Sequence, residues 1–264
     1  MNALLSLPWF VGHWFGRWLR ASGVVALLLG RVVRELPRMR GREYVRALQE
    51  FGVASLPLAS IVGVVIGAMV VLQTSLYTDR FGARAFLGWA AGYAVLWEFG
   101  PLMLGLMMNA RVGARNAAEL ASLQIGGQIE GLSGVSVDPL AVLIAPRVWG
   151  MVTAIALLGM PTYLLGILSE AVAAKLTLEL PLRVFLENFA GMIGLTELAG
   201  GVLKILCYAW AVALISTALG LRAAGGARAV GQAAAASVVW GAAAIFSLDF
   251  AVSGVLASLA EWFS

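Results

Sequence analysis

Residues 51–78 read FGVASLPLASIVGVVIGAMVVLQTSLYT, a run of 28 positions without a charged side chain. An α-helix rises about 1.5 Å per residue, so about 20 such residues cross the roughly 30 Å hydrocarbon core of a bilayer. The run therefore predicts a membrane-spanning helix. The composition of all 264 residues agrees, because 61% are hydrophobic and only 12% are charged. Soluble domains carry about 25% charged residues, so a water-soluble enzyme is excluded.

Four further apolar stretches are long enough to cross, and three of them carry an inner charged residue: Glu98, Lys204 and Asp249. We expect five spans, over residues of about 51–78, 85–110, 140–172, 195–221 and 229–262. The predicted fold is an all-α integral membrane protein. Residues 1–50 form an N-terminal helical segment in this prediction, and residues 51–264 form a five-span domain.

The basic residues are unevenly distributed along the chain. Eight of the 18 precede residue 51. Because Lys and Arg are enriched on the cytoplasmic side of membrane proteins, this bias predicts a cytoplasmic N-terminus. Five spans then place thirteen basic residues inside and four outside, with Lys204 within the membrane. The formal charge of +4 therefore indicates an orientation in the membrane rather than a nucleic-acid partner.

Aromatic residues alternate with basic ones near the N-terminus. The aromatic members are Trp9, Phe10, Trp14, Phe15 and Trp18. Rings on one side of a helix and cations on the other are typical of an amphipathic helix that lies in the membrane interface. In the alternative, residues 4–30 insert in part as a re-entrant or sixth element, although the apolar part at 21–30 is too short to cross.

Charged side chains at the predicted depth of Glu98, Lys204 and Asp249 are unfavourable, because insertion of a charge at the centre of a span costs about 2.5–3.5 kcal/mol on insertion scales. We expect the three to pair with one another. Asp249 follows Arg228 by 21 residues, about 31 Å of straight helix, which places it nearer the outer face than Glu98 unless a helix is kinked or displaced. Four other glutamates fall in or beside the outer loop and are interpreted as solvated surface charges: Glu170, Glu179, Glu187 and Glu197.

The connection over residues 111–147 is predicted to be cytoplasmic. Helix-forming residues at 114–125 are followed by two glycines and later by the turn Val137-Asp138-Pro139. A short helix parallel to the membrane would suit a docking element, and a solvated loop of mixed charge is the alternative.

Energy supply and catalysis are not expected from this chain. Its only lysines are Lys175 and Lys204, and neither follows a glycine, so no phosphate-binding G-x-x-x-x-G-K-[ST] loop exists. The single histidine, His13, and the single cysteine, Cys207, offer no recognised metal-site spacing and no Ser/His/Asp set. We therefore expect no catalytic residue, no metal site and no cofactor in this chain.

Several short motifs occur in order along residues 98–147: EFGP (98–101), ARVGA (110–114), AEL (118–120), QIEGL (128–132), VDP (137–139) and PR (146–147). Residues 225–231, GGARAVG, and 248–250, LDF, complete the set. From residue 51 to its end the chain resembles the MlaE/YrbE permease family. Members of that family are membrane subunits of ABC transporters that handle phospholipids or related hydrophobic molecules.

The resemblance implies a homodimer in a bacterial inner membrane, with five spans and an interfacial N-terminal helix. It implies two copies of a separate cytoplasmic ATPase that carry ATP and Mg, a periplasmic MCE-domain lipid-binding protein, and a small STAS-type regulator as a further partner. It also places Glu98, Lys204 and Asp249 near the lipid cavity. The residues that it assigns to ATPase coupling are Arg111, Arg115, Glu119, Gln128, Glu130, Asp138 and Arg147.

One departure from the family concerns Gly127, where members usually have a glutamate. Two other functions remain open from the residues alone. One is an ion-coupled secondary carrier, with Glu98, Lys204 and Asp249 as a proton relay. The other is a membrane scaffold that anchors soluble partners without transport.

Overall fold

The computed structural model describes residues 23–39, 41–82 and 86–263, and no β-strand occurs in these ranges. A helix over residues 23–34 comes first. The elements that follow are η1 (Leu36–Arg38), α2 (Gly41–Phe51), η2 (Val53–Ser55), α3 (Leu56–Arg80), α4 (Leu87–Ala94), η4 (Val95–Phe99), α5 (Gly100–Met108), η5 (Asn109–Gly113), α6 (Ala114–Ile125), α7 (Gln128–Gly134), η6 (Leu140–Ile144), α8 (Ala145–Leu178), α9 (Leu182–Met192), α10 (Leu195–Leu221) and α11 (Ala227–Phe263).

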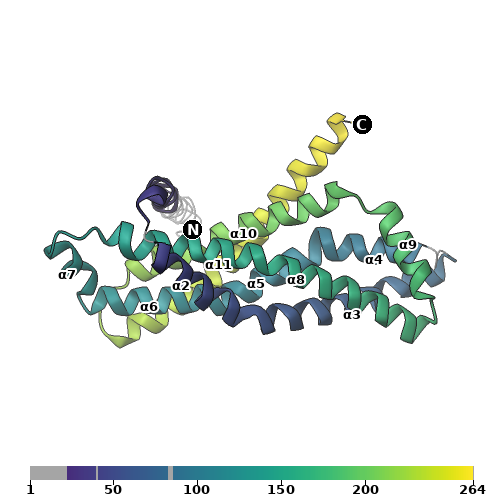
Figure 1. Cartoon of the computed structure of the whole chain (residues 1–264), viewed down its shortest axis with the longest axis horizontal. Coiled ribbons are helices and arrows are strands. Elements are labelled where there is room, and N and C mark those ends of the chain that lie inside the picture. The colour runs from purple at the N-terminus through teal and green to yellow at the C-terminus, as the bar shows by residue number, and fades with distance from the viewer. Residues whose placement is uncertain (1–22, 40, 83–85, 264) are drawn as a thin grey trace, which may run out of the picture.

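Within the described ranges, five helical stretches are long and apolar enough to cross a membrane. They are Gly41–Thr78, Leu87–Ile125, Leu140–Leu178, Leu195–Leu221 and Ala227–Leu259. Most of their length runs along the long axis of the molecule (Figure 1). The predicted all-α membrane fold with five spanning helices is confirmed.

The second spanning helix is longer than expected. Its predicted end was near residue 110, but it continues through the π-helical turn η5 into α6, which ends at Ile125. A π turn adds one residue to a helical turn without breaking the helix. Residues 114–125 therefore extend the span roughly in line with α5 (Figure 1). They do not form the separate helix parallel to the membrane that the sequence analysis considered.

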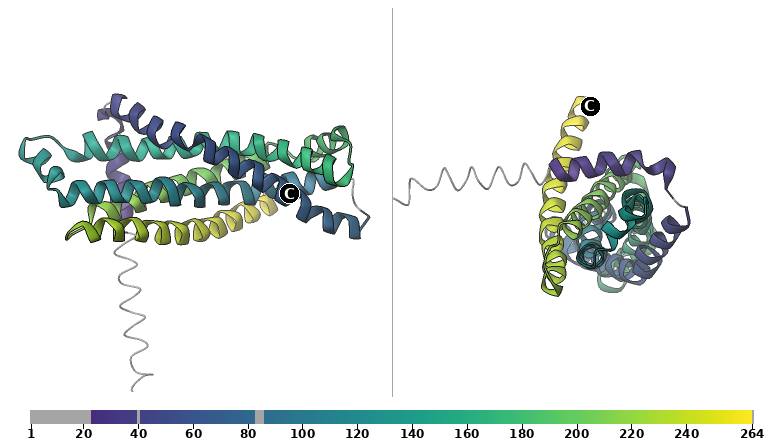
Figure 2. Two further views of the ribbon diagram at one scale, coloured as in Figure 1. Left: turned by 90° about the horizontal axis from the view of Figure 1, so that it is seen from below. Right: turned by 90° about the vertical axis from the view of Figure 1, so that its left-hand side faces the viewer.

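The helix over residues 23–34 lies across the bundle (Figure 2, right). Its Val32 is fully buried, and the Trp149 indole of α8 donates a hydrogen bond to the Val32 carbonyl at 3.3 Å. A helix across the bundle axis lies parallel to the membrane plane, the orientation of an interfacial helix. The aromatic residues predicted for this role, Trp9 to Trp18, lie outside the described residues. Residues 4–22 of the alternative, partly inserted element (4–30) lie outside them too.

The tightest helix crossing joins α3 to α8. A Cβ at Gly63 would lie 2.5 Å from the Thr162 carbonyl oxygen, and one at Gly67 would lie 2.1 Å from that of Gly166. The Thr162 hydroxyl donates to the Ala59 carbonyl at 3.3 Å across the same contact. Small residues four positions apart let helix backbones approach in lipid, where apolar burial does not drive association.

The last helix, α11, packs on the bundle through its first half and then diverges from it (Figures 1 and 2). In the first half, the Asn109 amide, 1% exposed, donates to the Val238 carbonyl at 2.8 Å. Gly241 makes room for that amide, since a Cβ there would lie 2.1 Å from Asn109 Oδ1. In the second half Phe250 is 85% exposed, so this chain alone does not cover it.

Substitution of Gly67 by alanine tests the α3–α8 contact. The added methyl group meets backbone rather than a flexible side chain, so the two helices must separate. We expect Gly67→Ala to lower the free energy of unfolding by about 1–3 kcal/mol. The measurement is the thermal unfolding midpoint of the detergent-purified protein. The control is Gly254→Ala on α11, where a Cβ meets nothing within 4 Å. Equal midpoints for the two variants would contradict the prediction.

Candidate functional site: a buried ion cluster and a short helix at one end of the bundle

Lys204 of α10 is completely buried and lies between two carboxylates from different helices. Its Nζ is 2.6 Å from Glu98 Oε2 on η4 and 3.1 Å from Asp249 Oδ1 on α11. The acids are less enclosed, with side-chain exposures of 38% for Glu98 and 19% for Asp249. The structure thus brings together the three charged residues whose pairing the sequence analysis expected.

Two hydroxyl groups complete the cluster. Tyr208, one turn after Lys204, donates to Asp249 Oδ1, and Ser253 of α11 donates to Glu98 Oε1 at 3.2 Å. Lys204 Nζ also lies 5.6 Å from the centre of the Trp97 ring. Each charge therefore has several partners, as a charge away from water requires. With both acids ionised, the two carboxylates and one ammonium group give the cluster a net negative charge of one.

The Asn109–Val238 hydrogen bond explains how Asp249 reaches the depth of Glu98. Glu98 lies eleven residues before Asn109, and Asp249 lies eleven residues after Val238. The sequence estimate instead measured Asp249 from Arg228, as if the start of α11 were at the membrane surface. Helix α11 starts alongside α6 (Figure 1), well inward of that level, so the expected offset disappears.

Glu98 sits on a π-helical turn, η4, in which the Gly100 amide bonds to the Val95 carbonyl. The hydroxyl of Tyr163 on α8 donates to the Leu96 carbonyl of this turn at 3.1 Å. Gly201 of α10 approaches the same carbonyl so closely that a Cβ would lie 2.1 Å from its oxygen. Helices α8 and α10 thus hold the turn that carries Glu98 against Lys204.

Removal of the buried ammonium tests the cluster. Lys204→Met leaves two carboxylates facing each other without a cation, and we expect a loss of about 3–5 kcal/mol in unfolding free energy. The combined variant Glu98→Gln/Lys204→Met/Asp249→Asn has no charge to strand, so most of this stability should return. Thermal unfolding in detergent measures both. A triple variant no more stable than Lys204→Met would contradict the ion-pair explanation.

Glu170 was interpreted as a solvated surface charge, and the structure shows that this was wrong. Its side chain is 0% exposed, and neither carboxylate oxygen has a hydrogen-bond partner. The position on α8 explains the difference: Glu170 follows Gly166 by four residues, on the face that packs against α3. The four-residue spacing from Gly166 could have indicated this burial, whereas the prediction of a surface charge used only the closeness of Glu170 to the outer loop.

The residues expected to couple to an ATPase fall into two groups. The first group links helices within the chain. Arg115 pairs with Glu50 of α2 and, at 2.7 Å, with Glu119, while Arg147 of α8 reaches Glu119 at 2.9 Å. Arg111 donates to the Ser55 hydroxyl at 3.1 Å and to the Ala54 carbonyl at 2.8 Å. Arg115, Glu119 and Arg147 thus link α2, α6 and α8, and Arg111 links η5 to η2.

The second group lies in or near α7, a short helix at one end of the molecule (Figure 1). Gln128 and Glu130 are exposed on it, and α7 has no buried residue. Asp138 is also exposed, and its carboxylate accepts a hydrogen bond from the Leu140 amide at 2.9 Å, at the start of η6. Gln128 and Glu130 are therefore exposed on a helix that itself has no buried residue, so they are available for contact with another protein.

Gly127 separates α6 from α7 with φ of +69°, in the left-handed region that favours glycine. A residue with a Cβ is strained in that conformation. The departure at this position, where family members usually have a glutamate, therefore fits the local turn between the two helices.

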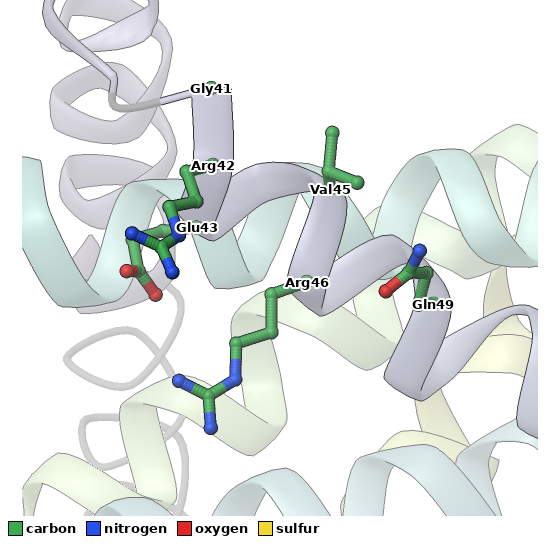
Figure 3. A pocket seen from close by; sticks show the side chains of 6 residues that line it. All are labelled: Gly41, Arg42, Glu43, Val45, Arg46 and Gln49. Atoms are coloured by element: carbon green, nitrogen blue, oxygen red, sulfur yellow. The ribbon is translucent and has the colours of Figure 1, made fainter.

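The surface of α2 has a shallow hollow of about 540 Å³, lined by Gly41, Arg42, Glu43, Val45, Arg46 and Gln49. Figure 3 shows that these residues all come from one helix. No polar groups from other elements converge there, so we assign it no ligand. The exposed arginines beside exposed Val45 are instead typical of a helix at a membrane surface.

Five described helices long and apolar enough to cross a membrane, with an internal ion cluster between them, define a multi-pass membrane protein. Residues 44–255 match the family model described as Permease MlaE. The match covers most of the chain, and the protein belongs to this family of ABC transporter permeases.

Several curated proteins are similar over most of their length. A probable ABC transporter permease protein of Rickettsia typhi is 24% identical, with 96% of this chain and 98% of the relative covered. The intermembrane phospholipid transport system permease protein MlaE of Haemophilus influenzae is 25% identical, with 90% and 92% covered. The chloroplastic protein TRIGALACTOSYLDIACYLGLYCEROL 1 of Arabidopsis thaliana is 23% identical, with 87% and 66% covered.

Proposed function

We propose that this permease moves phospholipid or a related lipid between a bacterial inner membrane and a periplasmic MCE-type carrier, driven by a separate ATPase. It acts as a homodimer with its N-terminus in the cytoplasm, and a small STAS-type regulator is a further proposed partner. ATP and Mg belong to the ATPase in this proposal. The similarity to the Haemophilus phospholipid permease supports the choice of cargo.

One observation carries the proposal: a charged cluster lies next to an apolar groove. The groove has a volume of about 450 Å³ between the start of α10 and the diverging end of α11. Its lining is Leu195, Thr196, Ala199, Gly200, Leu203 and Leu256, and it is mostly apolar. Gly200 lines the groove one turn before Lys204, on the same face of α10, so the groove and the cluster are neighbours. An amphipathic molecule matches this combination, because its chains suit the groove and its headgroup suits the charges.

The helix from α4 to α6 offers a mechanical link between the ion cluster and the end of the molecule that carries α7. It is continuous from Leu87 to Ile125, and it carries Glu98 in the cluster and α7 just beyond its inner end. A partner that pushes on α7 therefore displaces the same rod that holds Glu98. Such a displacement changes the contacts of Lys204 and the width of the groove, which is the proposed coupling of ATP hydrolysis to lipid movement.

The exposed residues of α7 provide a test of ATPase docking. We expect Gln128→Ala/Glu130→Gln to reduce co-purification of the ATPase and its lipid-stimulated turnover by about tenfold, because both side chains are free to contact a partner. The unfolding midpoint should stay unchanged. The matched control is Glu187→Gln, an exposed glutamate on α9 that pairs with Arg183. ATPase recovery equal to wild type would contradict docking at α7.

Reconstitution tests the function as a whole. The permease is placed in vesicles with its ATPase, and fluorescent phospholipid transfer to the MCE-type protein is followed with and without ATP. Transfer that requires ATP, and stops with a hydrolysis-deficient ATPase, is expected. Transfer driven by a pH gradient without nucleotide would indicate an ion-coupled carrier, and partner binding without any transfer would indicate a scaffold; either result contradicts the proposal.

A further inference from the structure

Three aromatic residues form a row along one face of the second spanning helix. Trp89 and Tyr93 lie on α4 and Trp97 on η4, four residues apart, so their side chains follow one another on the same face. The ring centres of Trp89 and Tyr93 are 6.2 Å apart. Those of Tyr93 and Trp97 are 5.8 Å apart, with only 14° between the ring planes. The rings therefore make a continuous aromatic row.

The inner end of this row meets the buried ion cluster. Lys204 Nζ lies 5.6 Å from the centre of the Trp97 ring. Helix α10 passes close to this ring through Gly200, where a Cβ would lie 2.3 Å from a Trp97 carbon. The outer end of the row remains open in the single chain, since Trp89 and Tyr93 are each 37% exposed. The row thus leads from the outer part of α4 to Lys204.

The surroundings of the row favour a positively charged ligand. Glu98 directly follows Trp97, and Glu197 lies one turn before Gly200, the residue of α10 that packs against the Trp97 ring. Together, Glu98, Asp249 and Lys204 have one carboxylate more than they have ammonium groups. The faces of tryptophan and tyrosine rings also attract cations, by about 0.5–2 kcal/mol per contact. Lys204 already uses one ring of the row in this way.

The apolar groove adjoins the same surface. Gly200 lines that groove and also lies against Trp97, so the aromatic row and the groove meet at this residue. A ligand at this junction needs an apolar chain of lipid size on one side and a cationic group on the other. A free metal cation or a small amine has no apolar chain to place in the groove, whereas an aminophospholipid can contact both the groove and the aromatic row.

We propose that Trp89, Tyr93 and Trp97 bind the ammonium-bearing headgroup of a zwitterionic phospholipid as it approaches Lys204, and that they favour this lipid over an anionic one. The inference rests on the proposed lipid transport and adds the headgroup class of the cargo. The negative charge of Glu98 and Glu197 repels an anionic headgroup, which gives the preference its direction.

The test compares two lipids on the full-length protein. The detergent-purified chain is incubated with equimolar dioleoyl-phosphatidylethanolamine and dioleoyl-phosphatidylglycerol, and bound lipid is counted by native mass spectrometry. We expect the wild type to retain more of the ethanolamine lipid. Tyr93→Leu/Trp97→Leu should reduce the ratio of the two bound lipids about fivefold, the effect of losing about one cation–π contact.

Three further variants separate headgroup recognition from folding. Tyr93→Phe/Trp97→Phe keeps the ring faces and should keep the wild-type ratio. Glu197→Gln removes a charge and should lower the ratio, while its amide oxygen can still accept the Gly194 amide hydrogen bond now made at 2.8 Å. Tyr77→Leu, at an exposed tyrosine of α3 outside the row, should leave the ratio unchanged.

Three results would overturn the inference. One is an equal ratio in wild type and Tyr93→Leu/Trp97→Leu. Another is an equal loss of both lipids in that variant. The third is a change from dimer to monomer at an unaltered lipid ratio, which would show that a second copy of the chain covers the row. Failure of the wild type to retain or transfer either lipid would instead overturn the proposed lipid transport itself.

Discussion

The ammonium group of Lys204 has no contact with solvent, and much of the bundle is arranged around it. An ionised group in the membrane needs partners at short range, and here they come from η4 and α11 on either side of α10. These helices must therefore match in depth as well as in position. The Asn109–Val238 hydrogen bond fixes the depth of α11 against the second spanning helix, and Tyr163 and Gly201 hold the turn that carries Glu98.

Close packing makes these polar contacts possible. Helices in lipid gain little from burying apolar surface against each other, so small residues and short hydrogen bonds determine which faces meet. The α3–α8 crossing uses Gly63, Gly67 and Gly166 in this way, and the α5–α11 region uses Gly241 against the Asn109 amide. The ion pairs of Arg115 and Arg147 with Glu50 and Glu119 serve a related purpose, since they join α2, α6 and α8. A force applied there is transmitted through a connected framework.

Spans and buried charges could be predicted from the sequence because both depend on local composition. The uncharged run at 51–78 and the isolated charges Glu98, Lys204 and Asp249 need no knowledge of neighbouring helices. The direction of α6 could not be predicted, because a π turn at residues 109–113 leaves no obvious mark in the sequence. The burial of Glu170 could not be predicted either. Its position near the end of a span suggested a surface residue, whereas its burial depends on which face of α8 packs against α3. Family motifs supplied the proposed roles, which physical patterns alone left open.

The aromatic row illustrates the same limit. Trp89, Tyr93 and Trp97 are four residues apart, and such spacing is common on lipid-facing helices, so it indicates nothing by itself. Only the position of α10, with Gly200 against Trp97 and Glu197 one turn before Gly200, gives the row a charged neighbourhood. The function of these residues is thus a property of two helices that are distant in sequence.

The π turn at Val95–Phe99 sets the direction in which the second spanning helix presents its later residues. A π turn contains one residue more than an α turn. One residue of an α-helix corresponds to a rotation of about 100° around the helix axis, since the helix has about 3.6 residues per turn. The π turns η4 and η5 therefore each rotate the residues that follow them by about 100° relative to an uninterrupted α-helix, and the face that α6 presents to α10 and α11 depends on both turns.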